Sequence, residues 1–210
     1  MRKEEVQDIL IFLKRSKQLQ TAERYGSSLT GMQNTVAEHS WRLGLMAYVI
    51  ATECKLNINL ERALSLALMH DLAEAKTGDI DAYTQIKEGK KLIEEKAKME
   101  VTAMKEMTGD LSFGERVYDL WQEYEDQKTM EAKFIKALDK IEGFLHIAEG
   151  EVEMYVPKEF HADYANKAVI AFDEATNHFP GLKDLLDAVK DNLRHQFDLA
   201  GVAWIDEPAS

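Results

Sequence analysis

Residues 60–76, Leu60-Glu-Arg-Ala-Leu-Ser-Leu-Ala-Leu-Met-His-Asp-Leu-Ala-Glu-Ala-Lys76, are apolar on several sides when wound as a helix. Such a helix is expected in the middle of a helical bundle, where neighbouring helices cover it on most sides. The same helical spacing of apolar residues recurs along almost the whole chain, and we find no convincing alternating pattern of a strand. The sequence therefore predicts an all-α fold.

Breaks in this pattern divide the chain into about eight expected helices. Their predicted ranges are Val6–Leu19, Thr35–Cys54, Leu60–Lys76, a charged segment with a stripe of Leu92, Met99, Ala103 and Met107, then Phe113–Tyr124, Met130–Glu149, Glu159–His178 and Leu182–Leu199. The two methionines of the stripe are expected to fill the core. Gly78 stands where a helix stop is expected, and Thr35-Val-Ala-Glu38 has the form of a capping box at a helix start. No repeat or linker is found, so we expect one domain over residues 1–210, with residues 151–210 forming its C-terminal helices.

The composition excludes several classes of protein. With 45% apolar and 30% charged residues, the 210-residue chain can bury a core, which excludes disorder and a collagen-like structure. The net charge of −12 repels nucleic acid and anionic bilayers, although a local cation or metal ion can still attract a small anionic substrate. Cys54 is the only cysteine, and neither a signal peptide nor a run of ~20 apolar residues is found. We therefore expect a cytoplasmic protein whose partner is neither a nucleic-acid polymer nor a membrane.

The pair His70-Asp71 lies inside the most hydrophobic of these helices. Burying an unpaired carboxylate there would cost several kcal/mol unless a cation or strong donors compensate. Glu74 follows at i+4 from His70 and i+3 from Asp71, so the three side chains share one helix face. This crowding favours a shared metal ion; the alternative is the polar end of a core helix, with a hydrogen-bonded histidine and both acids reaching solvent.

Two further residues are candidate ligands of the same ion. His39 starts the preceding helix, and antiparallel packing of the two helices would bring it to the same end as His70. Asp139 interrupts the segment Phe134–Ile141 and lies beside its apolar stripe, although it could also be a half-exposed acid paired with Lys136 or Lys140. His39 could likewise be a surface or capping histidine. Two imidazoles and two carboxylates suit Mn²⁺, Co²⁺, Fe²⁺ or Zn²⁺ and leave positions open for water and substrate. Such open positions favour catalysis over a structural site.

The pattern His39 … His70-Asp71 … Asp139 resembles the metal-binding signature of the HD-domain phosphohydrolases, an all-helical superfamily that acts on phosphate esters. The subfamily resemblance to the 5′-deoxynucleotidase branch is carried by Val36-Ala-Glu-His-Ser40, His70-Asp-Leu-Ala-Glu-Ala-Lys-Thr-Gly-Asp-Ile80, Leu120-Trp-Gln-Glu-Tyr-Glu125 and Glu131-Ala-Lys-Phe-Ile-Lys-Ala-Leu-Asp-Lys140. It covers residues 8–150. The resemblance implies an HD-domain fold, a deoxyribonucleoside 5′-monophosphate substrate, one divalent metal ion and a homodimer.

The resemblance also implies a role for each matching position. The metal ligands would be His39, His70, Asp71 and Asp139, and the ion would be Mn²⁺, Co²⁺, Fe²⁺, Zn²⁺ or Mg²⁺. Glu74 would hold and deprotonate the attacking water, and Asp79 would meet the sugar 3′-hydroxyl. Arg24-Tyr25 stands where the family has an Arg-Trp pair, so Arg24 would grip the phosphate and Tyr25 would flank the substrate.

With these residues, the resemblance implies a metal-dependent phosphohydrolase that removes the 5′-phosphate of (deoxy)ribonucleoside monophosphates by attack of a metal-bound water. One alternative is a non-catalytic helical module that keeps its metal and senses a nucleotide. Another is an HD-type phosphohydrolase for a different small phosphate ester. Glu74 argues against the non-catalytic module, because a structural metal site tends to be closed by protein ligands with no spare base.

Overall fold

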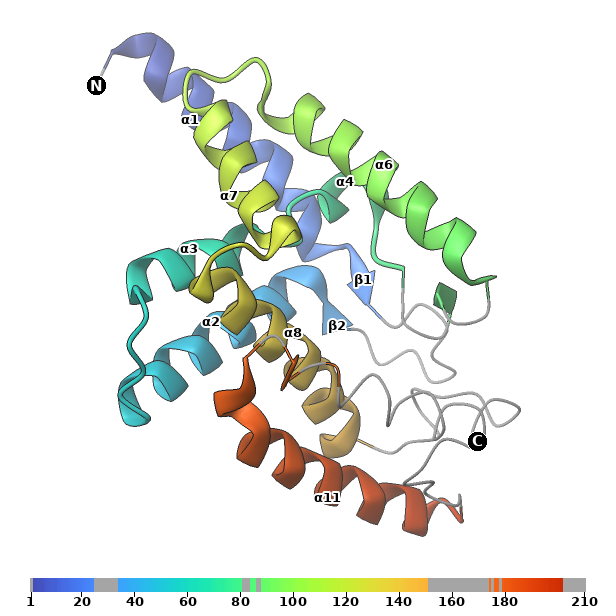
Figure 1. The fold of residues 1–210 in the computed structure, drawn as a ribbon. Helices are drawn as coiled ribbons and strands as arrows, with labels where there is room; N and C mark the ends of the chain where they lie inside the picture. Colours follow the sequence, from blue (N-terminus) through green and yellow to red (C-terminus); the bar gives the residue numbers. More distant parts are fainter. Residues whose placement is uncertain are drawn as a thin grey trace. The chain divides into compact units, whose positions relative to one another are not determined.

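The computed structural model describes residues 2–24, 34–80, 84–85, 88–150, 174, 176–177 and 179–201 (Figure 1). The helices with assigned bounds are α1 (Lys3–Ser16), α2 (Val36–Glu53), α3 (Leu60–Met69), α4 (Glu74–Thr77), α6 (Lys90–Thr108), α7 (Gly114–Asp126), α8 (Met130–Glu149) and α11 (Lys183–Leu199). Short 3₁₀ helices are η1 (Lys17–Gln20) and η3 (Pro180–Leu182), and the strands are β1 (Glu23–Arg24) and β2 (Asn34–Thr35). Helices thus make up nearly all of the regular structure in these ranges, which confirms the all-α prediction.

The described residues form two compact units. The first unit takes in those up to Ala132, and the second takes in those from Lys133 onward. The single domain predicted over residues 1–210 stays a prediction, and the helix predicted at residues 159–178 lies mostly outside the described residues. Within the described ranges, no helix combines the length and the apolar character that a membrane crossing requires.

In the first unit, α2 and α3 pack against each other. Their contact faces carry mostly small residues, since Ala47 and Ala51 of α2 and Ala63 and Ala67 of α3 are buried. Alanines on facing helices allow a close approach, because the distance between two helix axes depends on the side chains at the contact. This close pair of helices brings the start of α2 near the end of α3.

The neighbouring helices α4, α6 and α7 of the first unit share a second apolar cluster. It contains Leu72, Ala73, Ala75, Ala103, Met104, Met107, Val117 and Trp121. This packing fixes α4, which has a single turn, against the much longer α6. A helix of one turn has too few internal hydrogen bonds to be stable alone, so this cluster is what holds α4 in place.

The predicted helix Leu60–Lys76 is interrupted, which corrects the sequence prediction. Its first part ends at Met69, and α4 begins only at Glu74. Between them the backbone hydrogen bonds change from i−4 to i−3 spacing, as in the bond from Glu74 N to Asp71 O of 3.0 Å. Side chains three residues apart eclipse in such a tightened turn, so Asp71 and Glu74 lie on the same side of it. The interruption therefore keeps these two carboxylates close together.

Apolar residues of α8 and α11 supply the core of the second unit. On α8, Phe134 and Leu138 are fully buried, and the Phe134 ring packs edge-to-face on Phe179 with centroids 5.2 Å apart. On α11, Leu186, Val189, Leu193 and Phe197 are buried. The observed bounds of α8 agree with the prediction from the sequence.

Candidate metal centre

A capping box fixes the start of α2. Thr35 Oγ1 accepts a hydrogen bond of 3.2 Å from Glu38 N, and Glu38 Oε2 accepts one of 2.8 Å from Thr35 N. These bonds satisfy two amides that a helix start leaves without partners, and they confirm the capping box predicted from the sequence. His39 follows directly after Glu38 and is fully buried. The cap therefore holds the turn that carries the first candidate ligand.

Three of the four predicted metal ligands meet in the first unit. His39 Nε2 lies 3.2 Å from His70 Nε2, and His70 Nε2 lies 2.9 Å from Asp71 Oδ2. The distance from His39 Nε2 to Asp71 Oδ2 is 3.7 Å. Ligands bound to one ion at ~2.1 Å, with tetrahedral or octahedral angles, are about 3.0–3.4 Å apart. The three atoms therefore fit a single shared metal ion.

The contacts of His70 leave its Nε2 atom available to bind a metal ion. Nδ1 of His70 lies 3.0 Å from the backbone oxygen of Ala67. A carbonyl oxygen only accepts, so this bond assigns the proton to Nδ1 and leaves the lone pair of a neutral ring on Nε2. The ring of Tyr124 packs edge-on against His70, with centroids 5.1 Å apart, and fixes its orientation.

Glu74 is buried beside this group, with 4% of its surface exposed. It does not reach solvent, contrary to the polar-helix-end alternative. Oε1 accepts a hydrogen bond of 3.1 Å from Lys96 Nζ, whereas Oε2 is buried without a hydrogen-bond partner among the described residues. Burial raises the pKa of Glu74, the charge of Asp71 adds to the rise, and the pKa reaches about 9 although Lys96 opposes it. A buried oxygen of this kind needs a polar partner, and a water molecule or substrate group could provide it.

Lys96 is the residue at this site that the sequence analysis missed. It lies on α6, 22 positions after Glu74, and its side chain is 19% exposed. One signal was available in the sequence: Lys96 and Glu100 fall on the same helical face as the buried Ala103 and Met107. A lysine and an acid aligned with a buried face are expected to have a charged partner in the interior.

Asp79, Arg24 and Tyr25 were predicted to hold the substrate. Asp79 follows Gly78, which ends α4 with a φ of 71° and confirms the predicted helix stop. The charge of Asp79 contributes to the raised pKa of Glu74. Asp79 is thus close to Glu74. Arg24 lies on β1 opposite Asn34 of β2, so it is near the start of α2 in the hairpin. Tyr25 lies outside the described residues.

Asp139, the fourth predicted ligand, lies on α8 in the second unit. Its Oδ2 is 3.9 Å from Lys136 Nζ, which is the ion pair that the sequence analysis named as an alternative. The side chain is partly exposed, at 20%. Coordination of the metal by Asp139 stays a prediction.

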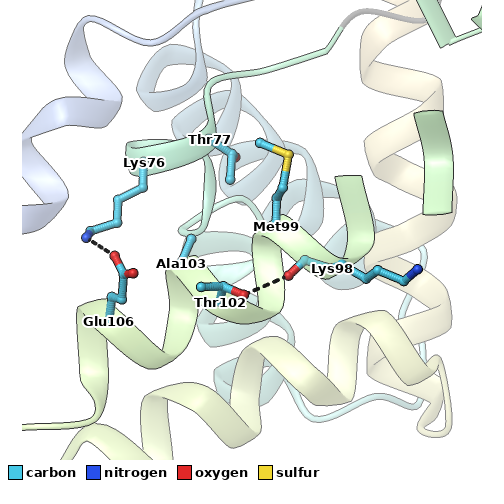
Figure 2. Close-up of a pocket in the computed structure, with 7 residues that line it drawn as sticks. All are labelled: Lys76, Thr77, Lys98, Met99, Thr102, Ala103 and Glu106. Atoms are coloured by element: carbon cyan, nitrogen blue, oxygen red, sulfur yellow. Dashed lines mark hydrogen bonds and ion pairs between the residues drawn. The ribbon is translucent and has the colours of Figure 1, made fainter. Parts of the chain in front are cut away.

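A separate pocket of about 420 Å³ lies between α4 and α6 (Figure 2). Its lining residues are Lys76, Thr77, Lys98, Met99, Thr102, Ala103 and Glu106, and none of them belongs to the candidate metal centre. Met99 is 51% exposed here, so its predicted place in the core is wrong. The buried face of α6 instead uses Met104, which lies five residues farther along the helix.

The comparisons with known proteins agree with this geometry. Residues 16–176 match the family model described as HD domain. The chain is 35% identical over 164 residues to the human 5′-deoxynucleotidase HDDC2, covering 76% of this chain and 76% of that protein. It is 33% identical over 151 residues to the 5′-deoxynucleotidase hdd1 of Schizosaccharomyces pombe, covering 68% of this chain and 72% of that protein.

Solved structures share the fold. A protein from Magnetospirillum magnetotacticum MS-1, described as a predicted metal-dependent phosphohydrolase, superposes with a TM-score of 0.76 at 23% identity, covering 96% of this chain and 97% of that chain. PH0347 from Pyrococcus horikoshii OT3 superposes with a TM-score of 0.64 at 24% identity, covering 89% and 99%. Together with the family match and the identity to the relatives above, this places the chain in the HD-domain family.

Proposed function

We propose that this chain is a metal-dependent phosphohydrolase that removes the 5′-phosphate from nucleoside monophosphates and prefers the deoxy forms. The observation that carries the proposal is a group of three ligand atoms, from His39, His70 and Asp71, within 4.8 Å of one another. Beside them stands Glu74, which has a buried carboxylate oxygen with no hydrogen-bond partner in the described structure. The relatives named 5′-deoxynucleotidase support the choice of substrate.

The metal ligands of this proposal are His39, His70 and Asp71, and Asp139 is proposed as the fourth ligand. When bound, a divalent ion supplies Lewis acidity, which polarises a phosphoryl oxygen and lowers the pKa of water. Imidazole nitrogens and carboxylate oxygens suit Mn²⁺, Co²⁺, Fe²⁺ or Zn²⁺, and Mg²⁺ is a further candidate. The bond from His70 Nδ1 to Ala67 O keeps Nε2 ready to coordinate.

Glu74 is the general base of the proposed reaction. Its Oε2 takes a proton from the attacking water, and the electron pair of the broken O–H bond forms the new bond to phosphorus. The bond from phosphorus to the sugar oxygen breaks, and its electron pair stays on that oxygen, which takes up the proton that Glu74 received from the water. Burial and Asp71 raise the pKa of Glu74 to about 9, above neutral pH, so its base form depends on nearby cations: Lys96 lowers this pKa, and a bound divalent ion would lower it further.

Three other side chains would hold the substrate. Asp79 would accept a hydrogen bond from the sugar 3′-hydroxyl, and Arg24 would bind the phosphate through two parallel hydrogen bonds. Tyr25 would flank the sugar and base. Asp79 is supported by its closeness to Glu74, and Arg24 by its place in the hairpin that leads into α2.

Phosphate release from matched deoxyribonucleotides and ribonucleotides, with Mn²⁺ or Co²⁺ added, tests this function. We expect kcat/KM to be about 5- to 150-fold higher for the deoxy form, because a 2′-hydroxyl buried without a partner costs about 1–3 kcal/mol. Steady-state rates on dAMP and AMP, with the same enzyme and metal, measure the ratio.

Other results of this assay would revise the proposal in different ways. Equal rates on both sugars would remove the deoxy assignment and leave a phosphohydrolase. Release from a simple ester such as glycerol phosphate, without release from any nucleotide, would favour a different substrate. No release from any ester with any of the metals would contradict the enzymatic function and favour a nucleotide-sensing module.

We also propose that the protein is a homodimer. Trp41, Leu45 and Tyr48 are exposed on α2 at i, i+4 and i+7, so they form one apolar stripe on this helix. Exposed apolar stripes of this kind often mark protein interfaces. We expect twice the chain mass in sedimentation, and the mass of a single chain for Trp41→Glu. A wild-type protein that sediments as one chain at all concentrations would contradict the proposal.

The cytoplasm is the compartment that we propose, with a small nucleotide as the partner. Cys54 is the only cysteine in the sequence, so the chain cannot form an internal disulfide. The net charge of −12 also disfavours a nucleic-acid polymer or an anionic membrane as partner.

A further inference from the structure

Lys96 is a buried cation that joins α6 to the candidate metal centre. Its Nζ lies 3.1 Å from Glu74 Oε1 and 3.4 Å from Glu100 Oε1. All three side chains are largely shielded from solvent, with 19%, 4% and 14% exposure for Lys96, Glu74 and Glu100. A buried ion pair is costly to desolvate, so it adds little to stability compared with an apolar pair of similar size.

The contact with Lys96 involves only one of the two oxygens of Glu74. A charge-assisted hydrogen bond at Oε1 fixes the plane of the carboxylate, and the direction of Oε2 is then fixed as well. Oε2 is buried and has no hydrogen-bond partner among the described residues. Glu100, one helical turn after Lys96, holds the ammonium from the other side.

The surrounding charges keep Lys96 in its cationic form. Burial disfavours that form, but the charges of Glu74 and Glu100, with those of Asp71 and Asp79, outweigh burial and raise the pKa of Lys96 above its ordinary value. The charge of Lys96 in turn lowers the pKa of Glu74, against the effects of burial and of Asp71. Lys96 therefore remains an ammonium that can donate to Oε1 of Glu74.

We propose that Lys96 is a positioning residue for the hydrolysis: its ammonium holds Oε1 of Glu74, so that Oε2 alone is presented to the attacking water. This inference rests on the proposed function, in which Glu74 is the base. Lys96 itself touches neither the substrate nor the metal in this scheme. Lys96 affects the rate only by orienting the carboxylate of Glu74.

A double-mutant cycle tests this dependence. We expect Lys96→Met to lower kcat about 10- to 100-fold, because a small misplacement of a catalytic group costs up to about 10²-fold. KM and the metal content of the purified protein should not change. In a Glu74→Ala background, Lys96→Met should lower kcat no further. Lys98→Met is the matched control, since Lys98 lies on the same helix, is exposed and lines the separate pocket.

Lys96→Arg separates the charge of Lys96 from its packing. This variant keeps a cation near Glu74 and should retain more turnover than Lys96→Met. Equal losses in both variants would overturn the inference, as would wild-type kcat in Lys96→Met. A further loss in the Glu74→Ala background would also overturn it, because Lys96 would then act on the substrate directly.

Thermal melting of the wild type, Lys96→Met, Glu74→Ala and the double variant gives a readout that does not depend on activity. Removing one partner leaves the other buried without its counter-charge, so each single variant should melt several degrees lower, by about 5 °C or more. The melting temperature of the double variant should fall by less than the sum of the decreases in the two single variants. Additive shifts would overturn the pairing. Wild-type protein that releases no phosphate, but shows non-additive melting, would contradict the proposed function and leave the pairing intact.

Discussion

Replacing Glu74 with alanine should lower the turnover of nucleotide hydrolysis by about 10²- to 10⁴-fold while the protein keeps its metal, because the general base is lost and the ligands remain. The three clustered ligand atoms come from His39, His70 and Asp71, and Glu74 is not among them. Turnover at saturating substrate and metal analysis of the purified variant measure the two effects separately.

Glu106→Ala is a suitable control for that experiment. Glu106 lies on α6 and pairs with Lys76 at the edge of the separate pocket (Figure 2), so its loss should leave turnover unchanged. Turnover of Glu74→Ala at the wild-type level would remove Glu74 from the mechanism. Loss of the metal in the same variant would instead make Glu74 a ligand.

Asp71→Ala should lose both the metal and the activity. Asp71 Oδ2 is within 2.9 Å of one candidate imidazole nitrogen and 3.7 Å of the other, and it supplies the negative charge in the cluster. Loss of residues that merely orient ligands already weakens metal binding by about 10- to 100-fold, so loss of a ligand should cost at least about 100-fold. Metal titration followed by elemental analysis measures the affinity.

Asp79→Ala provides the contrast for that experiment. Asp79 is assigned to the sugar and not to the metal, so this variant should keep its metal and show a raised KM. If Asp71→Ala binds as much metal as the wild type, the metal centre proposed here is wrong. If Asp79→Ala loses the metal, then Asp79 has a role in coordination that the proposal does not give it.

Local signals in the sequence were sufficient for several features of the fold. The capping box at Thr35 and the stop at Gly78 depend on hydrogen bonds and backbone angles within a few residues, and both predictions are confirmed. The meeting of His39 and His70 was also predictable, because two consecutive helices joined by a short turn pack antiparallel. These predictions needed only residue types and their spacing.

Other features depend on contacts between distant segments. Residues 70–73 contain neither glycine nor proline, so nothing in the sequence indicates the break between α3 and α4. Lys96 was missed because Glu74, its partner, is 22 positions away on another helix. Met99 was assigned to the core by its spacing, but it lines the pocket between α4 and α6 and is half exposed.

The tightened turn between α3 and α4 also limits which insertions the chain can tolerate. Each added residue rotates the following helix by about 100° to 120° about its axis. One extra residue between Asp71 and Glu74 would therefore swing the Glu74 carboxylate out of its place beside Lys96, even with every side chain unchanged. The same residue inserted after Gly78 would leave both groups in position. For an engineer who varies this protein, the number of residues in the turn is a stricter constraint than their identity.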